Sequence, residues 1–211
     1  MKKLLLALTL ISGLAFTANA QDFGFKKGNV LLEGNIGLSS NDNKTTEIKK
    51  NTFTFTPKAG YFVTDKIAIG VELHFSTEKT EDYTAGAETL DKDNIFGAGV
   101  FGRYYFLELG KRFKTYAEAG VGYGSLKNEN KVGTAASVET KANVFGVNAG
   151  VGANYFLTER IAINAGLTNV INFSSIKADA PGAKTVSSFG LNAGSINNLF
   201  DIATFGLTFK F

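Results

Sequence analysis

The sequence contains no cysteine and no tryptophan, and it has only two prolines, one histidine and one methionine. Without cysteine the protein has no disulfide framework, no thiolate metal site, no cysteine nucleophile and no cysteine that a lipid could modify. The single histidine, His74, excludes a metal site built from several histidines, and acidic side chains alone would hold a cation weakly. We therefore expect no cofactor and no bound metal.

The chain also lacks a strong excess of charge and, after residue 20, it lacks a long apolar run. Its formal net charge is +3, which gives no indication of nucleic acid as a partner. No later segment has the roughly 18 continuous apolar residues that a transmembrane helix requires. Any membrane-spanning part would have to be built from shorter elements.

The first twenty residues, MKKLLLALTLISGLAFTANA, are set apart from the rest. Lys2 and Lys3 precede an apolar core, and Ala18 and Ala20 flank Asn19 as small residues at a cleavage site. This pattern predicts a secretory signal peptide over residues 1–20, and a permanent N-terminal anchor is the alternative. We expect residues 21–27 to form a short lead and residues 28–211 to form one domain.

From residue 28 onward the chain alternates apolar and polar residues with a period of two, which is typical of β-strands. In TYAEAGVGYGS, for example, Thr115, Ala117, Ala119 and Val121 share one face, and Tyr116, Glu118 and Gly120 share the other. Eight such stretches are predicted, at residues 28–39, 52–63, 66–76, 94–106, 113–125, 142–156, 160–173 and 199–211.

The connections between these stretches alternate between short and long. The short ones lie near residues 64–66, 109–111 and 158–160, and the phrase GYFVTDKIAIG at residues 60–70 returns as NYFLTERIAIN at 154–164. This pattern predicts an up-and-down meander with both termini on the side of the short turns. The long connections, rich in charged and amide residues, are predicted at residues 40–51, 77–93, 126–141 and 174–198.

Aromatic residues recur beside the short turns. A ring of such residues at one height is typical of a membrane–water interface, where an amphipathic ring lies half in lipid and half in water. We therefore predict an aromatic girdle at this end of a membrane barrel, and we expect this end to be periplasmic. The girdle residues are Tyr61, Tyr104, Phe106 and Tyr155.

The polar face of the strands carries charges at similar distances from the short turns. Facing lipid, each ion would cost about 2–4 kcal/mol near the midplane, whereas in a narrow lumen opposite charges can pair. We therefore predict that the apolar face contacts lipid and that an ion-paired, filled lumen lies inside. A soluble lipocalin-like barrel with the faces reversed is the alternative. The predicted lumen network is Glu33, Lys58, Glu72, Arg103 and Glu118.

The final strand, ATFGLTFKF, ends in an aromatic residue and has apolar residues at alternate positions: Phe205, Leu207, Phe209 and Phe211. It resembles the C-terminal assembly signal of Gram-negative outer-membrane barrels. With GYFVTDKIAIG and FGRYYF, the chain is similar to the small outer membrane protein β-barrel family, in the layout of OmpA-like and OmpX-like domains. The resemblance implies an all-β, eight-stranded antiparallel up-and-down transmembrane barrel, outer-membrane lipid around it and insertion by the barrel-assembly machinery.

Three functions are compatible with such a barrel. The first is a monomeric structural or surface-interaction protein without catalysis, whose loops carry no recognisable ligand motif. The second is a narrow gated pore for small solutes. The third, an outer-membrane lipid hydrolase, would use His74 and Ser76, because a spacing of two places both side chains on one face of a strand. We expect the first, since the predicted lumen is filled and ion-paired, and no orienting glutamate for a hydrolase can be placed from the sequence.

Overall fold

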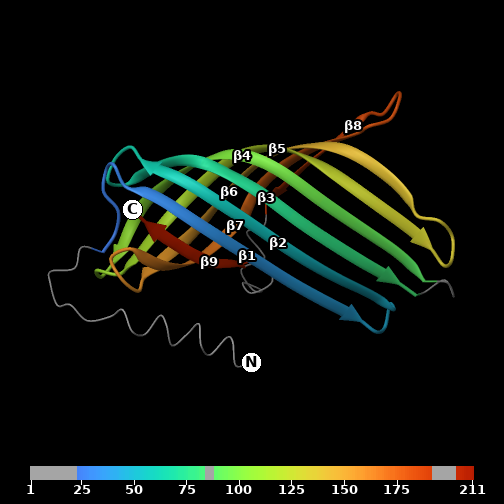
Figure 1. The fold of residues 1–211 in the computed structure, drawn as a ribbon, viewed down its shortest axis with the longest axis horizontal. Coiled ribbons are helices and arrows are strands. Elements are labelled where there is room, and N and C mark those ends of the chain that lie inside the picture. Colours follow the sequence, from blue (N-terminus) through green and yellow to red (C-terminus); the bar gives the residue numbers. More distant parts are fainter. Residues whose placement is uncertain (1–22, 84–87, 192–202) are drawn as a thin grey trace.

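The computed structural model describes residues 23–83, 88–191 and 203–211, which fold into an antiparallel β-barrel (Figure 1). The predicted cleavage residues Ala18 and Ala20 lie outside the described residues, so the signal peptide stays a prediction. The strands are β1 (Val30–Asn43), β2 (Ile48–Phe62), β3 (Ile67–Asp82), β4 (Thr89–Leu109), β5 (Phe113–Val132), β6 (Val138–Phe156), β7 (Ile161–Ala178), β8 (Thr185–Leu191) and β9 (Ala203–Lys210).

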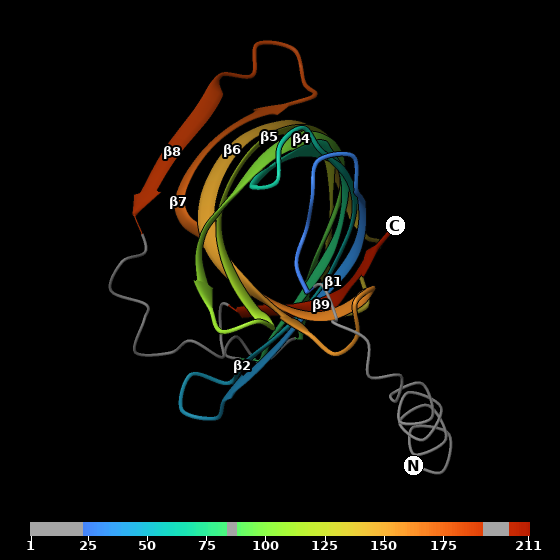
Figure 2. The same cartoon turned by 90° about the vertical axis from the view of Figure 1, so that its left-hand side faces the viewer.

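Eight of these strands close a ring, which is visible end-on in Figure 2. Strands β1 to β7 pair in chain order, and β9 pairs with β7 on one side and with β1 on the other. Closure matters because a spanning sheet with a free edge would leave backbone groups without hydrogen bonds in hydrocarbon. The predicted eight-stranded up-and-down barrel is confirmed.

The strands continue beyond their predicted ends. Where the structure describes them, the segments assigned to the connections at residues 40–51, 77–93, 126–141 and 174–198 are largely strand, so those boundaries are wrong. Outside the membrane a strand has water on its outer face, so the apolar alternation disappears while the ladder of backbone hydrogen bonds persists. Polar cross-strand pairs replace apolar ones, as where Lys127 of β5 pairs with Glu139 of β6 at 2.9 Å.

Strand β8 lies inside one of the predicted connections and is not part of the ring. It pairs with the far half of β7, with Phe173 opposite Phe189, and the β7–β8 hairpin projects away from the barrel wall (Figure 2). The alternation of apolar and polar residues in β8 is weak, because Ser187 and Ser188 interrupt the apolar residues on both faces of the strand.

The apolar face of the barrel points outward. Val100 and Phe205 expose 52% and 47% of their surface, whereas Arg103 exposes 1% and Glu118 9%. A soluble barrel would show the reverse, so that alternative is wrong. No helix that is long and apolar enough to cross a membrane occurs among the described residues.

The residues of the predicted aromatic girdle and of the predicted C-terminal assembly signal lie on the outer surface. They include the girdle residues Tyr61, Tyr104, Phe106 and Tyr155, and the terminal residues Phe205, Leu207, Phe209 and Phe211. The girdle residue Tyr61 lies opposite Val30, whose N–H donates to Phe211 O, so the girdle lies at the end of the barrel that holds the C-terminus (Figure 1). Recognition of the terminal strand by an assembly machinery stays a prediction.

Candidate functional site in the barrel interior

The structure brings together all five charged residues of the predicted lumen network. They come from five consecutive strands, β1 to β5, and the pairing register places them at neighbouring levels. Glu33 lies opposite Lys58, Lys58 lies opposite Glu72, and Arg103 lies opposite Glu118. Directly opposite residues share a face of the sheet, so alternation places all five inside the bore.

The best-enclosed pair of the network joins β1 to β4. Arg103 Nη1 donates to Glu33 Oε2 and Nη2 donates to Oε1, both over 2.8 Å. Three neutral groups also donate hydrogen bonds to the Glu33 carboxylate: Asn35 Nδ2, Asn164 Nδ2 and Thr208 Oγ1. A buried carboxylate is tolerated only with such a full set of partners, so Glu33 and Arg103 depend on each other.

Glu118 links Arg103 to the second cation. Arg103 Nε donates to Glu118 Oε2 over 2.7 Å, and Lys58 Nζ donates to Glu118 Oε1. Lys58 Nζ also pairs with Glu72 Oε2 at 2.7 Å. Three carboxylates therefore share two cations, and Glu72 is the member with the fewest partners.

A set of neutral polar side chains that the sequence analysis did not single out completes the network. Tyr105 OH donates to Asn154 Oδ1, and Asn154 Nδ2 donates to Thr208 Oγ1. Asn164 Nδ2 donates to Tyr116 OH, whose ring lies 3.9 Å from the Arg103 guanidinium carbon. In the sequence, these residues are marked only by their place on the polar face of the strands near the short turns. That pattern does not show which strands meet across the bore.

An aromatic floor closes the bore below the ions. Phe25, in the lead before β1, stacks on Phe62 with ring centroids 4.3 Å apart and also contacts Tyr105 and Phe156. The lead is fixed at both sides, since Lys210 Nζ donates to Gly24 O over 2.7 Å and Lys27 N donates to Asp65 Oδ1. The lead is thus a plug at the short-turn end. Residues 21–27 show no periodic pattern, so the sequence does not predict this plug.

Replacing Phe25 with alanine is expected to lower the unfolding free energy by about 1–3 kcal/mol, because a partly buried ring in aromatic contact is removed. Denaturant unfolding of the refolded protein in detergent micelles measures this. Phe23→Ala is the matched control, since that ring lies against the Arg112 guanidinium, 4.4 Å from its centroid. Equal losses in the two variants would show that Phe25 has no special role in closing the bore.

Above the ions the bore widens into a cavity of about 300 Å³. Its polar lining includes Glu72, His74, Asn148, Asn172 and Ser174, and glycines of β4 to β6 leave the space. His74 Nδ1 lies 3.4 Å from Thr56 Oγ1, and Ser76 Oγ lies 3.3 Å from Thr54 Oγ1. Within the described chain no hydrogen bond joins His74 to Ser76, so the hydrolase arrangement is not assembled.

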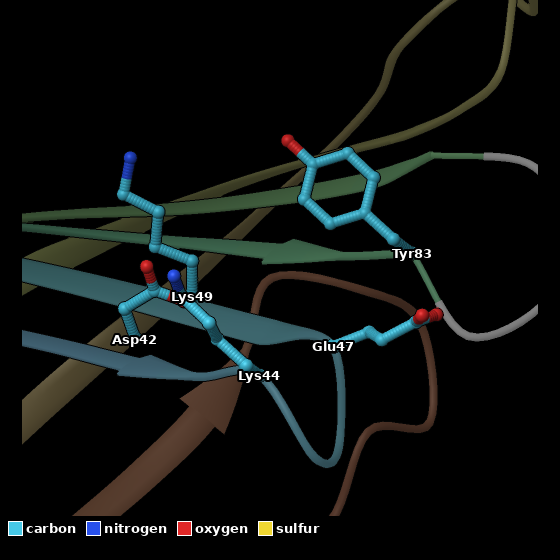
Figure 3. A pocket seen from close by; sticks show the side chains of 5 residues that line it. All are labelled: Asp42, Lys44, Glu47, Lys49 and Tyr83. Atoms are coloured by element: carbon cyan, nitrogen blue, oxygen red, sulfur yellow. The ribbon is translucent and has the colours of Figure 1, made fainter.

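Two further observations concern bound ions and the outer rim. In the part of the chain that the structure describes, no group of three or more histidine, aspartate or glutamate side chains could hold a metal. An open pocket at the tips of β1, β2 and β3 is lined by Asp42, Lys44, Glu47, Lys49 and Tyr83 (Figure 3). It mixes two acids with two bases, which indicates no single ligand charge.

A closed ring with apolar outer and charged inner faces defines an integral outer-membrane β-barrel. The family described as "Outer membrane protein beta-barrel domain" matches residues 4–211, and the chain belongs to this family. Its place in the outer membrane follows from that membership. No curated protein matches the chain.

Solved structures with the same kind of fold include two from Gram-negative bacteria. OprG of Pseudomonas aeruginosa is 16% identical, covers 89% of this chain and 98% of its own, and has a TM-score of 0.52. Outer membrane protein W of E. coli is 15% identical, covers 88% and 99%, and has a TM-score of 0.42. At such identity the likeness to OprG establishes the fold alone.

Proposed function

We propose that this protein is a closed, monomeric barrel with a structural or surface-interaction role, without catalysis and without a conducting lumen. The observation that supports this is closure of the bore at two successive levels. The Phe25 plug fills the short-turn end, and the Arg103 network with its tyrosines and asparagines fills the section above it. Nearly all of these side chains are buried.

The length of the strands supports a role at the surface. β4 has 21 residues and β5 has 20. At about 3.3 Å per residue and a tilt near 40°, such strands rise about 50 Å, roughly twice the apolar band of an outer-membrane barrel. These strands therefore extend beyond the hydrocarbon at their ends, and we expect the extension opposite the aromatic girdle to face the cell exterior as a pleated wall.

The expected partners follow from this arrangement. Outer-membrane lipid surrounds the apolar face, and the barrel-assembly machinery acts on the final strand during insertion. The projecting wall, including the β7–β8 hairpin with exposed Phe189, offers the contact surface for an extracellular partner. A rigid wall presents such a surface at lower entropic cost than free loops would.

In planar bilayers the purified protein is expected to give no steady openings, because buried and mutually bonded side chains fill the bore at the level of the ions. The measurement is single-channel current in the same bilayer in which a wide porin conducts. Steady openings of wild type whose size changes in Glu118→Gln would favour the narrow gated pore instead. Glu139→Gln, on the outer face beyond the membrane, is the control, and it leaves the bore unchanged.

A further inference from the structure

The outer surface carries a three-residue pattern that recurs on six consecutive strands. Moving away from the girdle, successive outward positions hold an aromatic residue, then asparagine, serine or threonine, then lysine. The six triplets are Phe53, Asn51 and Lys49; Phe75, Thr77 and Lys79; Phe96, Asn94 and Lys92; Tyr123, Ser125 and Lys127; Phe145, Asn143 and Lys141; and Phe173, Ser175 and Lys177.

The register confirms that these residues share the outer face. Phe53, Thr77, Asn94, Lys127 and Lys141 lie opposite one another along a single row from β2 to β6. Directly opposite side chains project from the same face, and the Phe53 ring is exposed on the lipid side. The six lysines, here called the lysine collar, therefore lie outside the barrel.

The collar lies at the height of lipid headgroups. On β3 the first outward residue is Ile67, and Lys79 follows twelve positions later; on β4, Lys92 is twelve positions from Tyr104. Twelve positions at about 3.3 Å and a tilt near 40° give about 30 Å, just beyond an apolar band of about 25 Å. The aromatic row below the collar then marks the second interface.

The charges of the collar are arranged with lysine nearest the membrane. On β3, β5 and β6 the next outward residue beyond lysine is an acid: Glu81, Glu129 and Glu139. A hydrogen bond from Lys79 Nζ lowers the pKa of the Glu81 carboxyl below its ordinary value, so Glu81 is ionised at neutral pH. The acids thus lie on the water side of the lysines.

Two pairs of collar lysines lie directly opposite each other, and one lysine of each pair, Lys79 or Lys127, is bonded to a carboxylate. Lys79 lies opposite Lys92, and Lys127 lies opposite Lys141, although like charges directly opposite on neighbouring strands are destabilising. Lys127 pairs with both Glu129 and Glu139 at 2.9 Å. Among the described residues, Lys92, Lys141 and Lys177 form no ion pair, although Lys92 lies opposite Glu129. These three ammonium groups are therefore the ones open to an external anion.

We propose that the lysine collar binds the phosphate groups of outer-leaflet lipids. An ammonium group is a compact charge well suited to phosphate, and a basic residue near an anionic membrane surface contributes about 1 kcal/mol. The asparagine, serine and threonine row lies one step deeper, where its amides and hydroxyls meet the ester, amide and hydroxyl oxygens of lipid. The aromatic row packs against the start of the acyl chains.

The collar is incomplete at β1, which reads Leu38, Ser40 and Asp42 in the same positions. Asp42 lies opposite Lys49 of β2, and both residues line the pocket in Figure 3. The acid lowers the positive charge of the collar where β2 meets β1, and Lys49 Nζ also lies 3.8 Å from Glu81 Oε2. We therefore expect bound phosphate along β3 to β7 and not at β1.

Native mass spectrometry of the folded protein in detergent tests this with lipid A and with lipid A lacking its phosphates. Wild type is expected to retain the phosphorylated form preferentially. A variant with Lys92→Gln, Lys141→Gln and Lys177→Gln should bind it about 100-fold more weakly, at about 1 kcal/mol per lysine. The matched control changes Lys66, Lys111 and Lys184, exposed lysines outside the collar, to glutamine.

The proposal is overturned if wild type does not distinguish the two lipids or if the control triple variant loses as much affinity as the collar variant. Heat-modifiable migration on gels shows whether each variant is folded. Should the collar variant not fold, the wild-type protein decides the question by salt titration. Retention of lipid A that is independent of salt concentration would then reject an electrostatic collar.

Discussion

Replacing Arg103 with methionine is expected to lower the free energy of unfolding by about 3–5 kcal/mol, the cost of leaving a buried charge without its partner. Arg103 exposes 1% of its surface and binds both oxygens of Glu33. Without it, Glu33 keeps only the neutral donors Asn35, Asn164 and Thr208. Denaturant titration of the barrel in lipid vesicles, followed by heat-modifiable gel migration, measures the loss.

Two second-site changes separate loss of charge balance from loss of packing. In the Arg103→Met background, Glu33→Gln should recover much of the stability, because it removes the orphaned charge. Glu118→Gln should recover less, since Glu118 retains Lys58 as a partner and its removal unbalances that lysine. If both double variants match the single variant, charge pairing is not what Arg103 contributes.

The alternation of residues predicted the ring because a membrane barrel gives each spanning strand two different solvents. Phe205 and Leu73 on one face, and Arg103 and Glu118 on the other, carry that information in the sequence itself. The same signal also showed that charged residues lie inside at similar heights. It could not assign partners, since which residues meet across the bore depends on the register and tilt of the closed sheet.

The features that the sequence did not predict lie where a strand no longer has lipid on one face and the barrel interior on the other. Beyond the hydrocarbon, Lys79 and Glu81 are strand residues that face lipid headgroups and water, and their polarity alone predicts a loop. Phe25 belongs to no strand and occupies the bore through the geometry of the whole barrel end. The lysine collar escapes a strand-by-strand search because its triplets run in opposite directions on alternate strands, and only the pairing register aligns them.

Glycine has a specific role where β2 and β3 approach beneath the ions. Gly70 lies opposite Gly60, and a Cβ at Gly70 would fall against the backbone oxygen of Ala59, 2.7 Å from the Gly60 Cα and 2.8 Å from the Phe101 ring. Phe101 in turn lies under the cations, with Lys58 Nζ 5.1 Å from the ring centroid. Backbone atoms of a paired strand cannot move aside to accommodate an added methyl group as a flexible side chain can.

Gly70→Ala is therefore expected to destabilise the barrel by about 1–3 kcal/mol, the usual cost of overpacking a tight interior. Gly102→Ala, on the outer face of the adjacent strand β4, is the matched control, since nothing lies within 4 Å of a Cβ there. The control should change stability by at most about 0.5 kcal/mol. Denaturant unfolding of both variants in the same micelles compares them. If Gly70→Ala is as stable as Gly102→Ala, β2 and β3 can move apart at no energetic cost. The ion pairs above Phe101 would then not depend on the close approach of these strands.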